Sequence, residues 1–312
     1  MQKRKRIPTL PAVQSLEDRT LLAGNVAASL SSEVLSLRGD AADNSVRITQ
    51  KSNGIVEIKG LDGTTINGKS SVSFNASRLE KTDLRLFGGN DRLEINNLRA
   101  RVDHNIEMDI GNDTVLLNQV VAGVNLTVKT DSGNDRVTAT GVRTGSDFHI
   151  ETEQGTSQVA VTNANVGGSL TILGKDSTDA VAVTGTTIAK DLKVDTGKGN
   201  DTVDIRNSTI NLSATVITDL GRDLVTLSNV RTREDLNLEL GEGDDWADLV
   251  DVRSDKNIKV TADTGVDSVS VRRVYAQYDA VFGGGDQFDT FGNYGVTAGE
   301  KLEIKEFERI LR

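Results

Sequence analysis

Residues 89–135 read GNDRLEINNLRARVDHNIEMDI, then GNDTVLLNQVVAGVNLTVKTDS, then GND, so the triplet Gly-Asn-Asp returns every 22 residues. The same step leads to further copies at Gly199-Asn200-Asp201, Gly221-Arg222-Asp223, Gly243-Asp244-Asp245 and Gly265-Val266-Asp267. The intervening positions hold the degenerate triplets Gly155-Thr156-Ser157 and Ser177-Thr178-Asp179, and we expect a last copy three residues early, at Gly284-Gly285-Asp286. A fixed period of this length predicts a stack of repeated units.

Apolar residues recur within each repeat at a spacing of two, which is typical of one face of a β-strand. The first strand is seen at Val115 and Leu117 and the second at Leu126 and Val128, and a weaker third apolar position lies between them. No copy shows the spacing of a helix, and no copy can bury its apolar face alone. We therefore predict an all-β fold, a single-stranded parallel β-helix (β-solenoid). It has about ten coils with two to three short strands each and is roughly 50 Å long.

Composition supports this fold and excludes several kinds of site. The only prolines, Pro8 and Pro11, stand before the repeats, and proline deletes a hydrogen bond from a paired strand. With no cysteine, disulfides and zinc-thiolate sites are excluded, and two histidines leave little for histidine chemistry. The net charge of −10 argues against a nucleic-acid partner. No apolar run is long enough for a transmembrane segment.

Four segments follow from these patterns. We expect a basic export-type leader at residues 1–27, irregular coils or a cap at 28–83, regular coils at 84–298 and a capping strand at 299–312. Leu16–Ala23, LEDRTLLA, resembles the LEDR-x-LL leader of predicted surface proteins of planctomycete-type bacteria. That resemblance implies an extracellular or cell-surface protein. It does not imply any particular activity. A disordered basic tail is the alternative, because no apolar signal-peptide core follows the basic residues.

The acidic turn before each first strand is the candidate binding site. Stacking repeats its carboxylates at about 4.8 Å, and calcium, which prefers six to eight oxygen ligands, would relieve their repulsion. The structural alternative is a stack of hydrogen-bonded Asx turns that needs no metal. Four copies read Asp-x-Gly-x-Asp, and the candidate calcium ligands are Asp109, Asp113, Asp131, Asp135, Asp201, Asp219, Asp223, Asp245, Asp263 and Asp267.

The turns GKGNDTVDI and GEGDDWADL, at 197–205 and 241–249, resemble the calcium-binding nonapeptide of hemolysin-type (RTX) repeats. That resemblance implies calcium held by the aspartate of each turn, and it adds Asp91 to the candidates. It covers the turns and not the whole coil, because one such turn occurs per 22 residues here, whereas RTX nonapeptides pair into 18-residue coils.

Two functions are compatible with these features. The first is a non-enzymatic surface or secreted solenoid, a spacer or adhesive module whose partner is a cell-surface or matrix polysaccharide or protein. The second is a carbohydrate-active β-helix enzyme, a polysaccharide lyase or glycosidase. An active site needs a local departure such as a long loop, and none interrupts the repeats between Gly89 and Gly265. The first function is therefore favoured.

Overall fold

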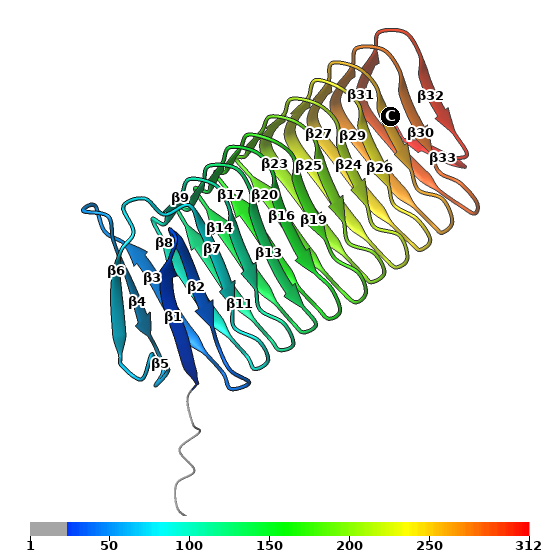
Figure 1. The fold of residues 1–312 in the computed structure, drawn as a ribbon. Helices are drawn as coiled ribbons and strands as arrows, with labels where there is room; N and C mark the ends of the chain where they lie inside the picture. The colour runs from blue at the N-terminus through cyan, green and yellow to red at the C-terminus, as the bar shows by residue number, and fades with distance from the viewer. Residues whose placement is uncertain (1–23, 312) are drawn as a thin grey trace, which may run out of the picture.

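The computed structural model of the protein describes residues 24–311, so the leader motif at Leu16–Ala23 lies outside the described residues. The coils of the protein stack along one straight axis (Figure 1). Val115 of β11 (Thr114–Asn118) pairs in parallel with Leu93 of β8 (Arg92–Asn96) on one side and with Val137 of β14 (Arg136–Thr140) on the other. Each partner lies 22 residues away, which confirms the predicted β-solenoid.

Two sheets run along the rod and share its core. Sheet I holds the first strand of each coil and a short strand that follows it. Its further members are β17 (Gln158–Thr162), β20 (Ala180–Thr184), β9 (Arg99–Ala100), β12 (Val121–Ala122), β15 (Arg143–Thr144), β18 (Asn165–Val166) and β21 (Thr187–Ile188). In later coils the two strands are continuous, as β23 (Thr202–Ile210), β25 (Leu224–Thr232), β27 (Trp246–Ser254), β29 (Ser268–Ala276) and β31 (Thr290–Ala298), followed by β33 (Arg309–Leu311).

Sheet II holds the remaining strand of each coil. Its members are β7 (Lys81–Arg85), β10 (His104–Glu107), β13 (Leu126–Asp131), β16 (Phe148–Thr152), β19 (Leu170–Leu173), β22 (Leu192–Asp195), β24 (Ala214–Ile217), β26 (Leu236–Glu239), β28 (Ile258–Thr261), β30 (Ala280–Gly283) and β32 (Leu302–Lys305). The described residues contain no helix, and hence none that is long and apolar enough to cross a membrane.

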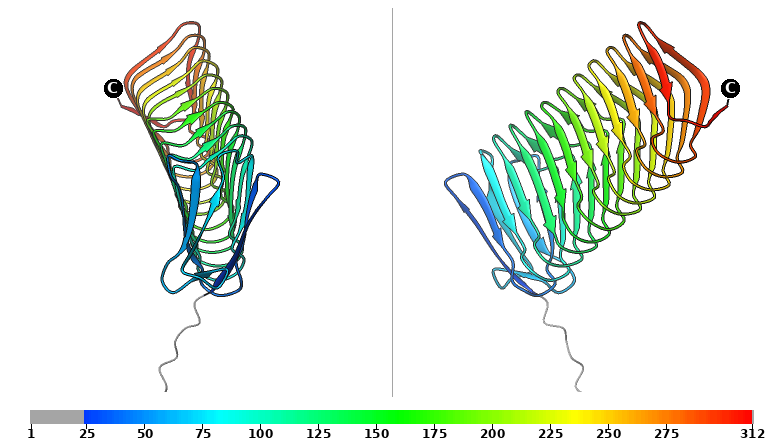
Figure 2. Two further views of the ribbon diagram at one scale, coloured as in Figure 1. Left: turned by 60° about the vertical axis from the view of Figure 1, so that its left-hand side comes forward. Right: turned by 90° about the vertical axis from the view of Figure 1, so that its right-hand side faces the viewer.

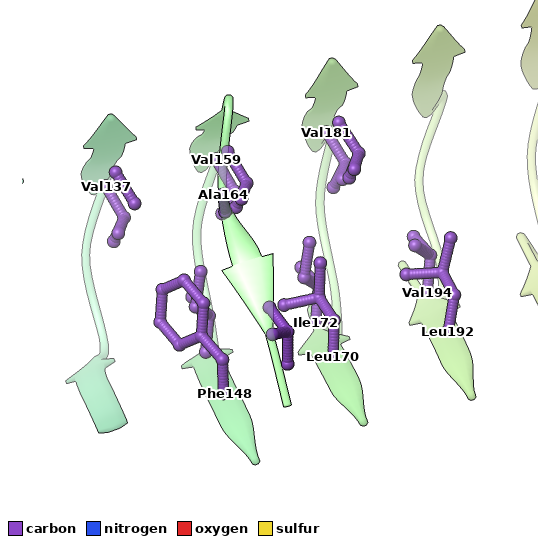
Figure 3. Packing of buried hydrophobic residues seen from close by; sticks show 14 of the residues in the cluster. Val137, Phe148, Val159, Ala164, Leu170, Ile172, Val181, Leu192 and Val194 are labelled. Atoms are coloured by element: carbon purple, nitrogen blue, oxygen red, sulfur yellow. The ribbon is translucent and has the colours of Figure 1, made fainter. Parts of the chain in front are cut away.

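Small aliphatic side chains fill the space between the sheets. Figure 3 shows Val137, Val159 and Val181 of sheet I above Phe148 and Leu170 of sheet II. All five are at most 5% exposed. Because each coil contributes the same inward positions, the core is one continuous column of side chains along the rod, and each coil is stabilised by its two neighbours.

The N-terminal end of the rod departs from the coil pattern (Figure 2). We expect irregular coils or a cap at 28–83. Most of the strands there pair antiparallel: β1 with β2, β3 with β4, and β4 with β6. Only β2 and β3 join the coils, in parallel with β7 and β8. The N-terminal strands are β1 (Asn25–Ser31), β2 (Val34–Arg38), β3 (Ser45–Gln50), β4 (Ile55–Gly60), β5 (Thr65–Ile66) and β6 (Ser71–Asn75).

A left-handed corner separates the first and short strands of sheet I. Asn97, Gln119, Gly141 and Asn163 occupy it in successive coils with φ between 52° and 64°. Asparagine and glycine tolerate this conformation best, which accounts for their recurrence there. The corner turns the short strands β9, β12 and β15 away from the plane of the first strands and leaves the corner side chains at the surface.

Candidate functional site

The aspartate of each Gly-x-Asp triplet points into the rod. Asp113, Val115 and Leu117 lie on one face of the chain, at spacings of two, and are 1%, 0% and 2% exposed. The alternation that buries the two apolar side chains thus also buries the carboxyl group before them. A buried carboxyl group must find hydrogen-bond partners or become neutral.

One oxygen of each carboxyl group binds the preceding coil. The Oδ1 atom of Asp223 accepts the backbone N–H of Asp201 at 2.7 Å, and the Oδ1 atom of Asp245 accepts that of Asp223 at 2.8 Å. Equivalent bonds join Asn44 to Asp91, Asp91 to Asp113, Asp113 to Asp135, Ser157 to Asp179, Asp179 to Asp201, Asp245 to Asp267 and Asp267 to Asp289. We call Asp91, Asp113, Asp135, Asp179, Asp201, Asp223, Asp245, Asp267 and Asp289 the aspartate ladder.

A second ladder beside it has the opposite sense. The Oδ1 atom of Asn90 accepts the backbone N–H of Asn112 in the following coil at 2.9 Å, and Asn112 does the same for Asn134 at 2.8 Å. Where both ladders are present, the turn is held from both sides. There they satisfy two backbone donors that strand pairing leaves free.

The other carboxyl oxygen, Oδ2, is buried without a hydrogen-bond partner in all nine members of the ladder. Burial raises the pKa of Asp113 to about 8, with the neighbouring Asp135 and Asp91 adding to it. Burial likewise raises the pKa to about 7 at Asp91, Asp179, Asp223, Asp245 and Asp267. Burial raises the pKa of Asp135 to about 6, and the backbone N–H of Asp113 that it accepts lowers it. Much of the ladder is therefore protonated near neutral pH.

The predicted ligands fall into two columns that face different surroundings. Asp113, Asp135, Asp201, Asp223, Asp245 and Asp267 belong to the buried ladder, as does Asp91. Asp109, Asp219 and Asp263 are exposed and Asp131 is half-buried, so the outer carboxylates face solvent. Each Asp-x-Gly-x-Asp turn thus places one carboxyl group inside the rod and one outside it.

Sequence reasoning missed two members of the ladder. Asp179 is not among the candidate ligands because its triplet lacks glycine, although the residue lies on the 22-residue step. The expected last copy at Gly284-Gly285-Asp286 is wrong: Asp289 accepts the N–H of Asp267 at 2.8 Å, while Asp286 is exposed. Gln287, with φ of 93°, stands where the glycine would be. The unbroken 22-residue count was the signal that identifies both residues.

The ladder is interrupted at one coil. Ser157 is 2% exposed and occupies the aspartate position, but its short side chain bonds within its own turn, to the carbonyl of Gly155 at 3.5 Å. It supplies no carboxyl or amide oxygen for the N–H of Asp135. The ladder therefore consists of two runs, which meet between Asp135 and Ser157.

The geometry of the buried column does not fit a calcium ion. Oδ1 of each aspartate is already bonded, and its backbone carbonyl accepts the N–H of the next coil, as Asp113 does from Arg136 at 2.8 Å. One free oxygen per coil falls short of the six to eight that calcium prefers. Among residues 24–311, no group of three or more His, Cys, Asp or Glu side chains is placed to hold a metal ion. Calcium at the outer aspartates stays a prediction.

His104 is a buried part of the structure. Its Nδ1 lies 2.9 Å from the Thr82 hydroxyl and its Nε2 lies 3.0 Å from the carbonyl oxygen of Val121. Burial lowers its pKa to about 4, so the ring is neutral at pH 7. Both ring nitrogens are thus in use inside the core.

No family model, curated protein or solved structure matches this chain.

Proposed function

We propose that this chain is a non-enzymatic secreted or cell-surface β-solenoid that serves as a structural spacer and adhesive module. The observation that carries the proposal is the constant coil. From Asp91 to Asp289 the aspartate position advances by 22 residues at every coil, with Ser157 at one of these positions and no inserted loop. In each turn of the ladder, one carboxyl oxygen is used in a bond between coils. A catalytic site needs a local departure that walls off substrate, whereas a rod needs uniformity.

The location is testable on intact cells of the native host. A spacer at the cell surface is accessible to an added protease, and peptides of residues 24–311 should be released from intact cells. A ribosomal protein, measured in the same samples, should stay intact. Protection of the chain to the same degree as the ribosomal protein would contradict a surface location.

The alternative function is a polysaccharide lyase or glycosidase. The purified chain should release neither reducing ends nor unsaturated products from a panel of neutral and acidic polysaccharides over a day. Product formation that is lost on heat denaturation of the protein would establish an enzyme instead.

Calcium stabilisation is a second candidate, which the outer column favours. Asp109 and Asp131 occupy equivalent positions in successive coils, and Glu153 follows in the next. The pKa of Asp131 is raised by partial burial and by the negative charges of Glu153 and Asp109. A cation at this surface would relieve that repulsion, in line with the resemblance of the turns to calcium-binding repeats.

A further inference from the structure

A groove without any carboxylate follows the left-handed corner near the N-terminal end of the rod, where β9 is labelled in Figure 1. Its first part, about 640 Å³, lies between the β3–β4 loop and the first coil and is lined by Gln50, Lys51, Asn53, Asn97 and Arg99 among others. Its second part, about 440 Å³, continues along Arg99, Gln119, Val121, Gly141, Arg143 and Asn163. Arg99 lines both parts, so the two hollows adjoin at this residue, and we call them together the groove.

The charge of the groove is opposite to that of the molecule. Asp and Glu make up 46 of the 312 residues, yet none lines either part. The cations are Lys51, Arg99 and Arg143, of which Lys51 is paired with Glu57 at 3.3 Å. Within the described residues, Arg99 and Arg143 form no ion pair.

Arginines of the same column elsewhere on the rod are neutralised. Arg231 and Arg253, at the equivalent position of later coils, both bind Asp255, at 2.7 and 3.0 Å. The two groove arginines thus differ from their structural equivalents in having their guanidinium groups free for an external anion.

The groove is held in shape by the fold. The backbone N–H of Arg99 donates to the Oε1 atom of Gln50 at 2.8 Å, which ties the end of β3 to the first coil. Arg99 and Arg143 flank Val121 in the parallel register of β9, β12 and β15. Two coil steps separate them, so the two charges stand roughly 10 Å apart over one apolar residue.

We propose that this groove binds an acidic polysaccharide, a polymer of sugars that carry carboxylate or sulfate groups. A planar guanidinium binds such an oxyanion through paired hydrogen bonds, and the amides of Asn97, Gln119 and Asn163 suit sugar hydroxyls. Nucleic acid is disfavoured because its dense phosphates call for many clustered cations, and here three stand in an acidic protein. This inference rests on the proposed adhesive function and specifies the ligand to which the protein would adhere.

Calorimetric titration of the full chain tests the proposal. The probes are polygalacturonate for carboxylates, dextran sulfate for sulfates, dextran as the neutral polymer and single-stranded poly(dT). Binding of at least one acidic polysaccharide, with none of dextran, is expected. In the double variant Arg99→Gln/Arg143→Gln, the affinity should fall at least about tenfold. The matched control Arg233→Gln, an exposed arginine outside the groove, should bind as the unaltered chain does.

Thermal unfolding of each variant checks that these surface changes leave the fold intact. Unchanged affinity of the folded double variant, or no binding of either acidic polymer, would overturn the proposal. So would poly(dT) binding as tightly as the sugars, which would assign the groove to phosphate chains. The protease and product assays above are separate readouts. If the chain is at the cell surface but binds no acidic polysaccharide, the spacer function remains supported and the proposed ligand is wrong. If it binds the polysaccharide and releases products, the groove is a binding site but the protein is an enzyme and not a spacer.

Discussion

A Cβ atom on Gly221 would lie 1.4 Å from the carbonyl oxygen of Gly199 in the coil below. The same approach recurs where other triplet glycines stack, with φ of 145° at Gly221, so two coils can meet at the turn only without side chains there. Gly221→Ala should lower the free energy of unfolding by more than about 2 kcal/mol, because the carbonyl belongs to a fixed backbone.

The matched control for this prediction is Gly141→Asn. Gly141 has φ of 64°, its Cβ would meet only the side chain of Gln119 at 3.6 Å, and Asn163 takes the same corner in the next coil. Its thermal midpoint should stay close to that of the unaltered protein. Equal losses in the two variants would show that left-handed backbone, not the contact between coils, requires the glycines.

Stability should depend on pH through the aspartate ladder. Burial raises the pKa of six members to about 7 or 8, above the unfolded value of 3.8, so the protonated form is favoured in the folded protein. Stability from this source is full below about pH 4 and is lost as pH rises through 7. The thermal midpoint should therefore be higher at pH 5 than at pH 8. A midpoint that rises from pH 5 to pH 8 would contradict the protonated ladder.

Replacing one ladder carboxyl group by an amide separates its two oxygens. Asp223→Asn keeps the oxygen that accepts the N–H of Asp201 and removes the charge. It should raise the thermal midpoint at pH 8 and change it little at pH 5. Asp223→Ala should lose about 1–3 kcal/mol at both pH values, since the buried N–H is left unpaired.

The exposed Asp286 provides the control for the charge change in that pair. Asp286→Asn alters the net charge by the same amount and should shift the midpoint by little at either pH. A stabilisation at pH 8 as large as that of Asp223→Asn would assign the effect to net charge and not to the ladder.

The gap in the ladder can be closed. Ser157→Asn would place an amide oxygen where the N–H of Asp135 has no carboxyl acceptor, without adding a charge. A neutral hydrogen bond of this kind contributes about 0.5–1.5 kcal/mol, and the thermal midpoint should rise accordingly. Ser177→Asn, at the neighbouring degenerate triplet but outside the aspartate position, should give no such gain.

Calcium is tested by thermal unfolding with excess calcium and with a chelator. A ligand that binds only the folded state raises stability by mass action. The proposed outer site predicts a higher midpoint in calcium, whereas the buried ladder, with one free oxygen per coil, adds nothing. Equal midpoints would contradict the calcium candidate. A higher midpoint in calcium, lost in the double variant Asp109→Asn/Asp131→Asn, would establish a metal at the outer column.

The regular coils could be predicted from the sequence because one period governs them. The alternation at Val115 and Leu117 and the constant 22-residue step identify strands, stacking and the inward face. The same alternation, carried back to Asp113, would have indicated a buried carboxyl group. The sequence pattern alone does not favour burial of this side chain, because carboxyl groups are rarely buried unless they are paired.

The N-terminal strands and the groove could not be predicted in this way. Antiparallel pairing of β3 with β4 depends on contacts between segments that share no repeat. The freedom of Arg99 and Arg143 is also a property of the assembled surface, because Asp255 binds Arg231 and Arg253 in later coils, whereas no carboxylate among the described residues pairs with either arginine of the groove.

The interruption between Asp135 and Ser157 has a mechanical consequence. The bonds that join coils run along the axis of the rod, so a pull on its two ends loads every junction between coils in series with the same force. A chain of junctions in series parts at its weakest member. Among the described regular coils, the junction between Asp135 and Ser157 lacks the ladder bond that its neighbours have, and lengthening the rod by further complete coils would not strengthen that junction.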